Sequence, residues 1–179
     1  RKRHTTGIWI WDKIFINKGR GFLLMDTQGL FDTETNQAVT TKIFALSTLT
    51  SSCLIFNVNK QIQEDHLQHI ALFSEYSKLL NADKQKAFQH LEILIRDWQH
   101  EEIGGGIYLK EIFSKRENTE LEETRFSIKN SFQTIDCSML PHPGFSVTNP
   151  NFTVTDLNTV FTQAVRSFVE KTVNENCDI

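Results

Sequence analysis

The sequence predicts an α/β fold in which a mostly parallel sheet is covered by helices on both faces. Short apolar segments alternate along the chain with longer amphipathic segments, and this order is typical of parallel sheets with helical crossovers. The apolar segments are nearly continuous, which indicates strands that are buried on both faces. The chain has 179 residues and no internal repeat or proline-rich linker, so one domain with a sizeable core is expected.

The expected strands are the most apolar parts of the chain. Residues 8–16 are rich in β-branched and aromatic side chains, and residues 22–25 are wholly apolar. The turn signal NKGRG, Asn17 to Gly21, separates these two segments and predicts a hairpin. Further strands are predicted at residues 53–58, 91–95 and 135–140.

Three amphipathic segments show the spacing of apolar residues that is typical of helices. The clearest is 156–173, where apolar residues recur every three or four positions. Thr155 or Asp156 is the expected N-cap of this helix, because both side chains can accept a backbone N–H. The other two helices are predicted at residues 63–80 and 118–132.

Composition and cysteine content narrow the class of protein. The net charge of -3 argues against a nucleic-acid-binding protein that neutralises phosphates. Cys53, Cys137 and Cys177 are far apart and form no CxxC pair, so free thiols in a reducing compartment are expected. The sequence contains no signal peptide and no apolar run of membrane-spanning length. The chain itself is therefore expected to be soluble and cytoplasmic.

A carboxylate and a glycine follow the apolar segment 22–25. Open parallel sheets place their ligands at the carboxyl ends of strands, so Asp26 and Gly29 are candidates for a site. A carboxylate there can hold Mg²⁺, directly or through water. A glycine lets its backbone N–H approach a phosphate, because no Cβ blocks the way. A turn with a helix cap is the alternative interpretation of this pattern.

Arg96 and Asp97 follow the predicted strand 91–95. The Asp97 carboxylate can accept both hydrogen bonds offered by the N1–H and 2-amino groups of guanine, a pair of donors that adenine lacks. A surface ion pair is the alternative. Thr5 stands ahead of the first strand, where its hydroxyl can either complete a magnesium shell or cap a turn. Prolines stiffen the segment from Pro141 to Pro150, which suits a lid beside a base pocket, and a simple connection is the alternative.

Six blocks of the sequence occur in a fixed order: HTTGIWIW, LLMDTQGLFD, FALSTLTSSCLIFNV, QEDHLQHIALFSEY, LIRDW and PHPGFSVTNPNF. In order and spacing they resemble the GTPase domain of the atlastins, dynamin-superfamily proteins of the GB1/RHD3 type that are related to the guanylate-binding proteins. The resemblance extends from His4 to about Val173. It implies a Ras-like sheet, GTP and GDP as ligands, and Mg²⁺ as the metal.

The resemblance also implies roles for residues near the phosphates. Asp26 and Gly29 resemble the third GTPase motif, with Asp26 acting on Mg²⁺ through water and Gly29 sensing the γ-phosphate. Gln28 resembles a nucleotide-contacting position. Thr5 resembles the switch threonine that binds Mg²⁺ when GTP is present, so Thr5 and Gly29 are the catalytic candidates.

Other positions resemble the family's base-binding residues. Arg96 and Asp97 match the pair that recognises guanine, and Val147 and Asn149 match the guanine-cap loop. That loop is one residue shorter here than the usual atlastin spacing. Gly104 to Gly106 fall in a variable part of the family and are interpreted as a flexible connection.

One motif of the family is missing, since the sequence contains no GxxxxGK[ST] P-loop. Residues 1–179 therefore resemble a partial GTPase domain that runs from the first switch to the helix after the guanine-cap loop, without the first strand, P-loop and first helix. We expect unpaired strand edges where the missing central strand would lie, and poor folding of the chain alone.

Two functions are consistent with this pattern. In the first, the chain belongs to a working GTPase that forms a nucleotide-dependent homodimer and fuses endoplasmic reticulum membranes from their cytosolic face. Membrane contact would then come from segments outside this chain. In the second, the chain is a truncated, non-catalytic interaction module. A GTPase of the guanylate-binding-protein type is a third possibility, which the QEDHLQH and PHPGFSVTNPNF blocks make less favourable than an atlastin.

Overall fold

A computed structural model describes residues 5–29, 37–80, 88–100 and 104–174. Its centre is a parallel sheet of three strands, in the spatial order β5 (Cys53–Asn59), β6 (Phe88–Trp98) and β7 (Phe132–Pro141). The register places Phe56 beside Ile93 and Ile93 beside Cys137. The strands predicted at 53–58, 91–95 and 135–140 are confirmed, and the last two are longer than predicted.

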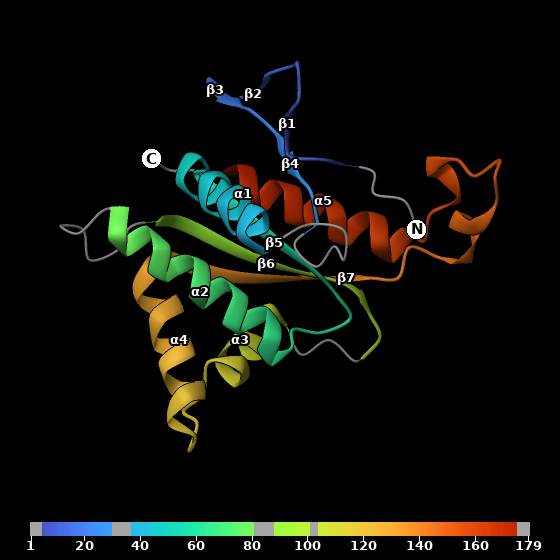
Figure 1. Ribbon diagram of the computed structural model, residues 1–179. Coiled ribbons are helices and arrows are strands. Elements are labelled where there is room, and N and C mark those ends of the chain that lie inside the picture. Colours follow the sequence, from blue (N-terminus) through green and yellow to red (C-terminus); the bar gives the residue numbers. More distant parts are fainter. Residues whose placement is uncertain (1–4, 30–36, 81–87, 101–103, 175–179) are drawn as a thin grey trace.

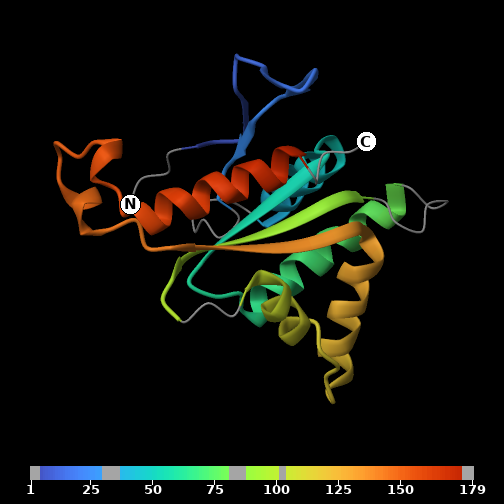
Figure 2. The ribbon, with the colours of Figure 1, turned by 180° about the vertical axis from the view of Figure 1, so that it is seen from behind.

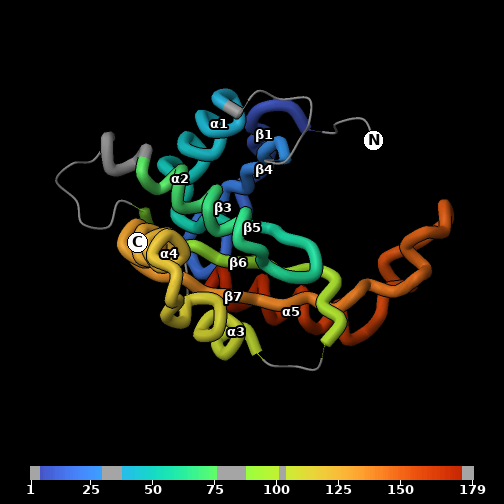
Figure 3. Tube along the Cα trace, turned by 60° about the horizontal axis from the view of Figure 1, so that its bottom comes forward, coloured from blue at the N-terminus to red at the C-terminus, as the bar shows by residue number. Residues whose placement is uncertain are grey.

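Helices cover both faces of this sheet. Figures 1 and 2 show α5 along one face and α2, α3 and α4 on the opposite face. Figure 3 shows α1 beside α2. The predicted α/β architecture is therefore confirmed. The helices are α1 (Gln37–Thr50), α2 (Glu64–Leu80), α3 (Gly105–Ile112), α4 (Thr119–Ser131) and α5 (Thr159–Asn174).

The core lies between the sheet and the helices on the α2 side. Leu91, Ile93 and Ile95 alternate along β6 and are at most 1% exposed, because they face this layer. Phe44 of α1 stacks on Phe73 of α2 with ring centroids 4.2 Å apart. This contact holds α1, which was not among the predicted helices, against the rest of the core.

Two antiparallel strand pairs precede the parallel sheet. The predicted turn is confirmed, since β2 (Phe15–Asn17) pairs with β3 (Arg20–Phe22), and Lys18 and Gly19 both have positive φ, as a tight two-residue turn requires. The single strand expected over residues 8–16 is instead two short strands, which residues 11–14 separate. The other pair is β1 (Ile8–Ile10) with β4 (Met25–Thr27). In Figure 1 these four strands extend away from the parallel sheet.

The structure corrects the expectation that residues 22–25 form a buried strand of the parallel sheet that ends before Asp26. Leu23 and Leu24 lie between β3 and β4 and are more than half exposed. Asp26 is the middle residue of β4, which pairs antiparallel with β1. Local apolar character predicted burial here, but no strand pairing among the described residues joins β4 to β5, and the leucines remain at the surface.

Two smaller expectations are also wrong. The helix predicted from residue 156 begins at Thr159, where the Asn158 side chain accepts the Val160 N–H at 2.9 Å. Asp156 instead closes a capping box with Thr153 in a short 3₁₀ helix. Gly105 and Gly106 are not a flexible connection, since they begin α3. Cys53 and Cys137 are free thiols, and Cys177 lies outside the described residues.

Candidate functional site

The structure brings Thr5 and Asp26 together. The Thr5 hydroxyl donates to a carboxylate oxygen of Asp26 at 2.8 Å. The strand pair positions both residues, because the β1–β4 ladder continues into a Gln28 N–H bond to the Gly7 carbonyl at 3.0 Å. The buried Gln28 side chain completes this link by accepting the Gly7 N–H, also at 3.0 Å.

The donor set of Thr5 and Asp26 fits Mg²⁺. Both groups offer oxygen, which this hard cation prefers. The 2.8 Å hydrogen bond brings both groups to one point of the surface, where Thr5 would hold Mg²⁺ directly and Asp26 through a water. The exposed position of Asp26 leaves room for the waters that Mg²⁺ usually retains.

Gly29 lies two residues beyond β4 and is exposed. A Cβ added there would meet no atom within 4 Å, and its φ is not in the left-handed region. The fold of the described residues therefore does not require glycine at this position. A phosphate that binds close to the backbone would be a functional reason for glycine at this position. That role remains a prediction.

Arg96 and Asp97 occupy an irregular part of β6 near its carboxyl end. The β6–β7 register is continuous to Ile95 opposite Met139 and resumes with Trp98 opposite Pro141. Two residues of β6 thus stand opposite one residue of β7, which is a β-bulge. Asp97 has φ +56°, an uncommon left-handed conformation that aspartate tolerates better than most residues.

Val147 and Asn149 lie in the segment after β7. Val147 is in the 3₁₀ helix Phe145–Thr148, and the Asn149 side chain accepts the Asn151 N–H at 3.0 Å. The Asn158 N–H donates to the Pro143 carbonyl at 2.8 Å, which closes the base of this loop.

A capping box orders the second half of the same loop. The Asp156 carboxylate accepts the backbone N–H and the hydroxyl of Thr153. These hydrogen bonds lower the pKa of Asp156, although the group is fully exposed. Asp156 therefore keeps its charge, and with it these hydrogen bonds, to a lower pH than an ordinary aspartate does.

The predicted residues thus fall into two groups. Thr5, Asp26, Gln28 and Gly29 are on or next to the β1–β4 pair. The other group is at the carboxyl edge of the parallel sheet, where the pairing of Trp98 with Pro141 brings Asp97 next to the start of the loop that contains Val147 and Asn149. In the part of the chain that the structure describes, no strand pairing joins the two groups, and the β1–β4 pair touches α1.

Tyr108 of α3 was not among the residues predicted from sequence. Its hydroxyl accepts the Ile62 N–H at 3.1 Å, and its ring meets the Trp98 ring edge-on at 5.4 Å. Burial raises the pKa of Tyr108, and the bond from Ile62 opposes that shift only in part. Tyr108 therefore ties the loop after β5 to the segment that contains Asp97. No local pattern predicts this contact, because it joins three separate elements.

A charged cluster lies between the sheet and α5. The Lys171 ammonium of α5 is 3.6 Å from a carboxylate oxygen of Glu92 and 3.6 Å from one of Asp136. His90 Nε2 is 3.2 Å from the same Glu92 oxygen. His90, Glu92 and Asp136 are close enough to share a metal ion, but Lys171 already supplies positive charge there. We interpret the cluster as a structural link between α5 and the sheet.

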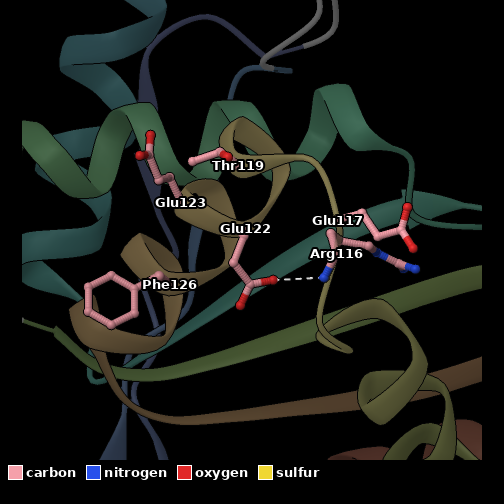
Figure 4. A pocket seen from close by; sticks show the side chains of 6 residues that line it. All are labelled: Arg116, Glu117, Thr119, Glu122, Glu123 and Phe126. Carbon is pink, nitrogen blue, oxygen red and sulfur yellow. Dashed lines mark hydrogen bonds between the residues drawn. The ribbon is translucent and has the colours of Figure 1, made fainter.

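A shallow cavity of about 260 Å³ lies at the start of α4, away from all the predicted residues. Figure 4 shows the Glu122 side chain turned toward Arg116, whose backbone N–H it accepts at 2.9 Å. Glu122 therefore helps to fold the α3–α4 connection. The lining residues are Arg116, Glu117, Thr119, Glu122, Glu123 and Phe126.

The chain matches a known family model, the guanylate-binding protein N-terminal domain, over residues 1–178. The chain belongs to this family. It is 40% identical over 185 residues to Atlastin-2 of Homo sapiens, an alignment that covers 94% of this chain and 32% of that protein. It is 38% identical to Atlastin of Drosophila melanogaster, over 94% of this chain and 34% of that protein.

Atlastin-1 of Bos taurus gives a similar result, with 43% identity over 84% of this chain and 30% of that protein. The chain therefore spans roughly a third of the length of these curated relatives. None of the helices in the described residues has the length and apolarity that a bilayer crossing requires. These matches confirm that the chain belongs to the predicted family and is similar to GTPases of the atlastin type.

Proposed function

We propose that this chain is the base-reading and switch portion of an atlastin-like GTPase, with GTP and GDP as its ligands. The observation that carries the proposal is the position of Asp97. This half-buried residue stands in a bulge at the carboxyl edge of a parallel sheet, next to Pro141, where the chain leaves β7 toward Val147 and Asn149. Such edges are where open α/β sheets bind their ligands.

The β1–β4 pair has a separate role in the proposal. Thr5 and Asp26 would hold Mg²⁺, whose charge offsets that of the nucleotide phosphates when it is bound. The Gly29 N–H would donate to the terminal phosphate, and Gln28 would keep β1 and β4 in register beside it. The bond between Thr5 and Asp26 supports this assignment, because it brings the two oxygen donors side by side.

The wider role follows from the relatives. We infer hydrolysis of GTP, nucleotide-dependent pairing of two copies, and fusion of endoplasmic reticulum membranes from the cytosolic side. The similarity to proteins named atlastins over most of this chain supports these assignments.

The substitution Asp97→Asn tests base recognition in the natural protein that contains this sequence. Asparagine tolerates the left-handed backbone at this position. Its side-chain NH₂ group donates where one carboxylate oxygen of Asp97 would accept. The variant should therefore favour xanthine, which has a carbonyl where guanine has an amino group. We expect GTP binding, measured by calorimetry, to weaken roughly 100-fold and XTP binding to appear. Glu117→Gln on the exposed α3–α4 connection is the control. Unchanged GTP binding by the Asp97 variant would contradict the assignment.

Exposed apolar residues favour a second candidate, a non-catalytic interaction module. Trp9, Trp11, Ile14 and Ile16 of the β1–β3 region are each more than half exposed, and apolar groups that gather at a surface commonly mark interfaces. Calorimetry on the unmodified natural protein separates the two candidates. Binding of GTP but not ATP supports the GTPase, whereas binding of neither supports the interaction module.

A further inference from the structure

We propose that Asn57 is a positioning residue for base recognition, because its side-chain oxygen holds the guanidinium of Arg96, the residue that directly precedes Asp97 in β6. This inference rests on the proposed function and adds to it a residue that no motif identified.

The contact is made across two strands. Asn57 of β5 is paired with Leu94, and Arg96 of β6 is paired with Asn59. Leu94 and Arg96 are two positions apart, so the side chains of Asn57 and Arg96 project from the same face of the sheet. The Arg96 Nε–H donates to Asn57 Oδ1 at 2.6 Å. The acceptor must be the amide oxygen, since a guanidinium only donates.

The bond involves Nε of Arg96, and this position on the side chain determines what the bond restrains. A bond to Nε restrains the plane of the guanidinium close to its attachment point and leaves the terminal nitrogens for another partner. A planar guanidinium stacks well on aromatic rings. Arg96 can therefore contact the face of a purine while the neighbouring Asp97 reads its edge.

The backbone around Arg96 is already fixed. The Lys60 N–H donates to the Arg96 carbonyl at 2.7 Å, and the bulge places Arg96 and Asp97 opposite one residue of β7. The exposed Arg96 side chain is the part that would otherwise sample many rotamers. Asn57 removes that freedom before the ligand arrives, and such pre-organisation improves affinity.

The test compares binding in the natural protein that contains this sequence. Calorimetry would measure GTP and GDP affinity for Asn57→Ala, Arg96→Ala and the double variant. We expect Asn57→Ala to weaken both nucleotides by the same roughly 3- to 10-fold factor, because a base contact is common to both. In the Arg96→Ala background, Asn57→Ala should have no further effect. The melting temperature should not change, since Asn57 is exposed.

Two further variants sharpen the test. Asn57→Asp keeps an acceptor for Nε–H and should bind GTP within about twofold of the unmodified protein. Asn57→Leu has a similar shape without the acceptor, so it should behave like Asn57→Ala and serves if the alanine variant folds poorly. Gln89→Ala, an exposed position on β6, is the control and should bind normally.

Two results would overturn the inference and leave the proposed function intact. One is normal GTP binding by Asn57→Ala and Asn57→Leu. The other is a loss that adds to the loss from Arg96→Ala, because a purely structural role does not depend on Arg96. If the unmodified protein binds no GTP, the proposed function and this inference both fail.

Discussion

A Cβ atom added to Gly105 would lie 1.9 Å from the carbonyl oxygen of Cys137. Gly105 begins α3, and Cys137 is in the middle of β7, so the first turn of the helix rests directly on the strand backbone. Only a residue without a side chain allows this approach. The contact sets the position of α3 and, through it, of Tyr108 and Trp98 at the edge of the sheet.

Gly105→Ala should destabilise the fold, because the helix must move away from β7 to relieve the overlap. We expect a loss of about 1–3 kcal/mol in the free energy of unfolding, measured by urea denaturation. Gly106→Ala is a matched control, since a Cβ at Gly106 meets no atom within 4 Å. Alanine is the better helix former, so this control should be neutral or more stable. Equal effects at the two glycines would contradict the explanation.

A bidentate salt bridge between Arg125 and Glu64 links α4 to α2. The two bonds are 2.9 Å and 2.8 Å long, and the Arg125 side chain is 4% exposed. Glu64→Gln would leave this buried cation without its carboxylate. The Glu64 side chain is 33% exposed, so solvent screening reduces the loss to about 1–2 kcal/mol. Glu117→Gln at an exposed site should have no measurable effect in the same denaturation experiment.

Glu92 should make stability depend on pH. Burial alone would raise the pKa of this carboxyl, but hydrogen bonds from His90 and Ser138 and the charge of Lys171 bring it below its ordinary value of 4.5. A group whose pKa falls on folding stabilises the native state above its unfolded pKa, and this contribution is lost as the pH drops through the folded pKa.

Glu92→Gln tests that pH dependence. The variant should be less stable than the unmodified protein at neutral pH, and the difference should shrink as the pH falls below about 4.5. Urea denaturation at a series of pH values measures it. A difference that stays constant from neutral to acidic pH would show that Glu92 contributes through packing and not through its charge.

Cys137 should resist alkylation in the folded protein. Burial, with a smaller contribution from the negative charge of Glu92, raises the pKa of the Cys137 thiol to about 12. Very little reactive thiolate is then present near neutral pH. Iodoacetamide labelling followed by peptide mass spectrometry should show Cys53, which is only partly buried, reacting well before Cys137. In denaturant the two rates should become similar, and early labelling of Cys137 in the native state would contradict the prediction.

The local sequence was sufficient to predict a strand or a turn where the pattern lies within that one element. The segments 53–58, 91–95 and 135–140 are apolar enough to be strands in any packed sheet, and the turn at Lys18 and Gly19 needs only residues that accept positive φ. The candidate residues Thr5, Asp26 and Asp97 were identified from sequence for a similar reason. Each belongs to a short block that resembles a known motif, although nothing in the fold alone assigns their roles.

The sequence by itself therefore determined the class of fold, the family and the candidate ligand residues. Tertiary structure decided which segments are buried and which side chains meet. Leu23 and Leu24 look like core residues but are exposed, because burial depends on a neighbouring layer and not on apolarity alone. Strand register and backbone contact produce three further features: the bulge at Asp97, the packing of α3 against Cys137, and the bond between Asn57 and Arg96. These are relationships between distant residues, which no local pattern encodes.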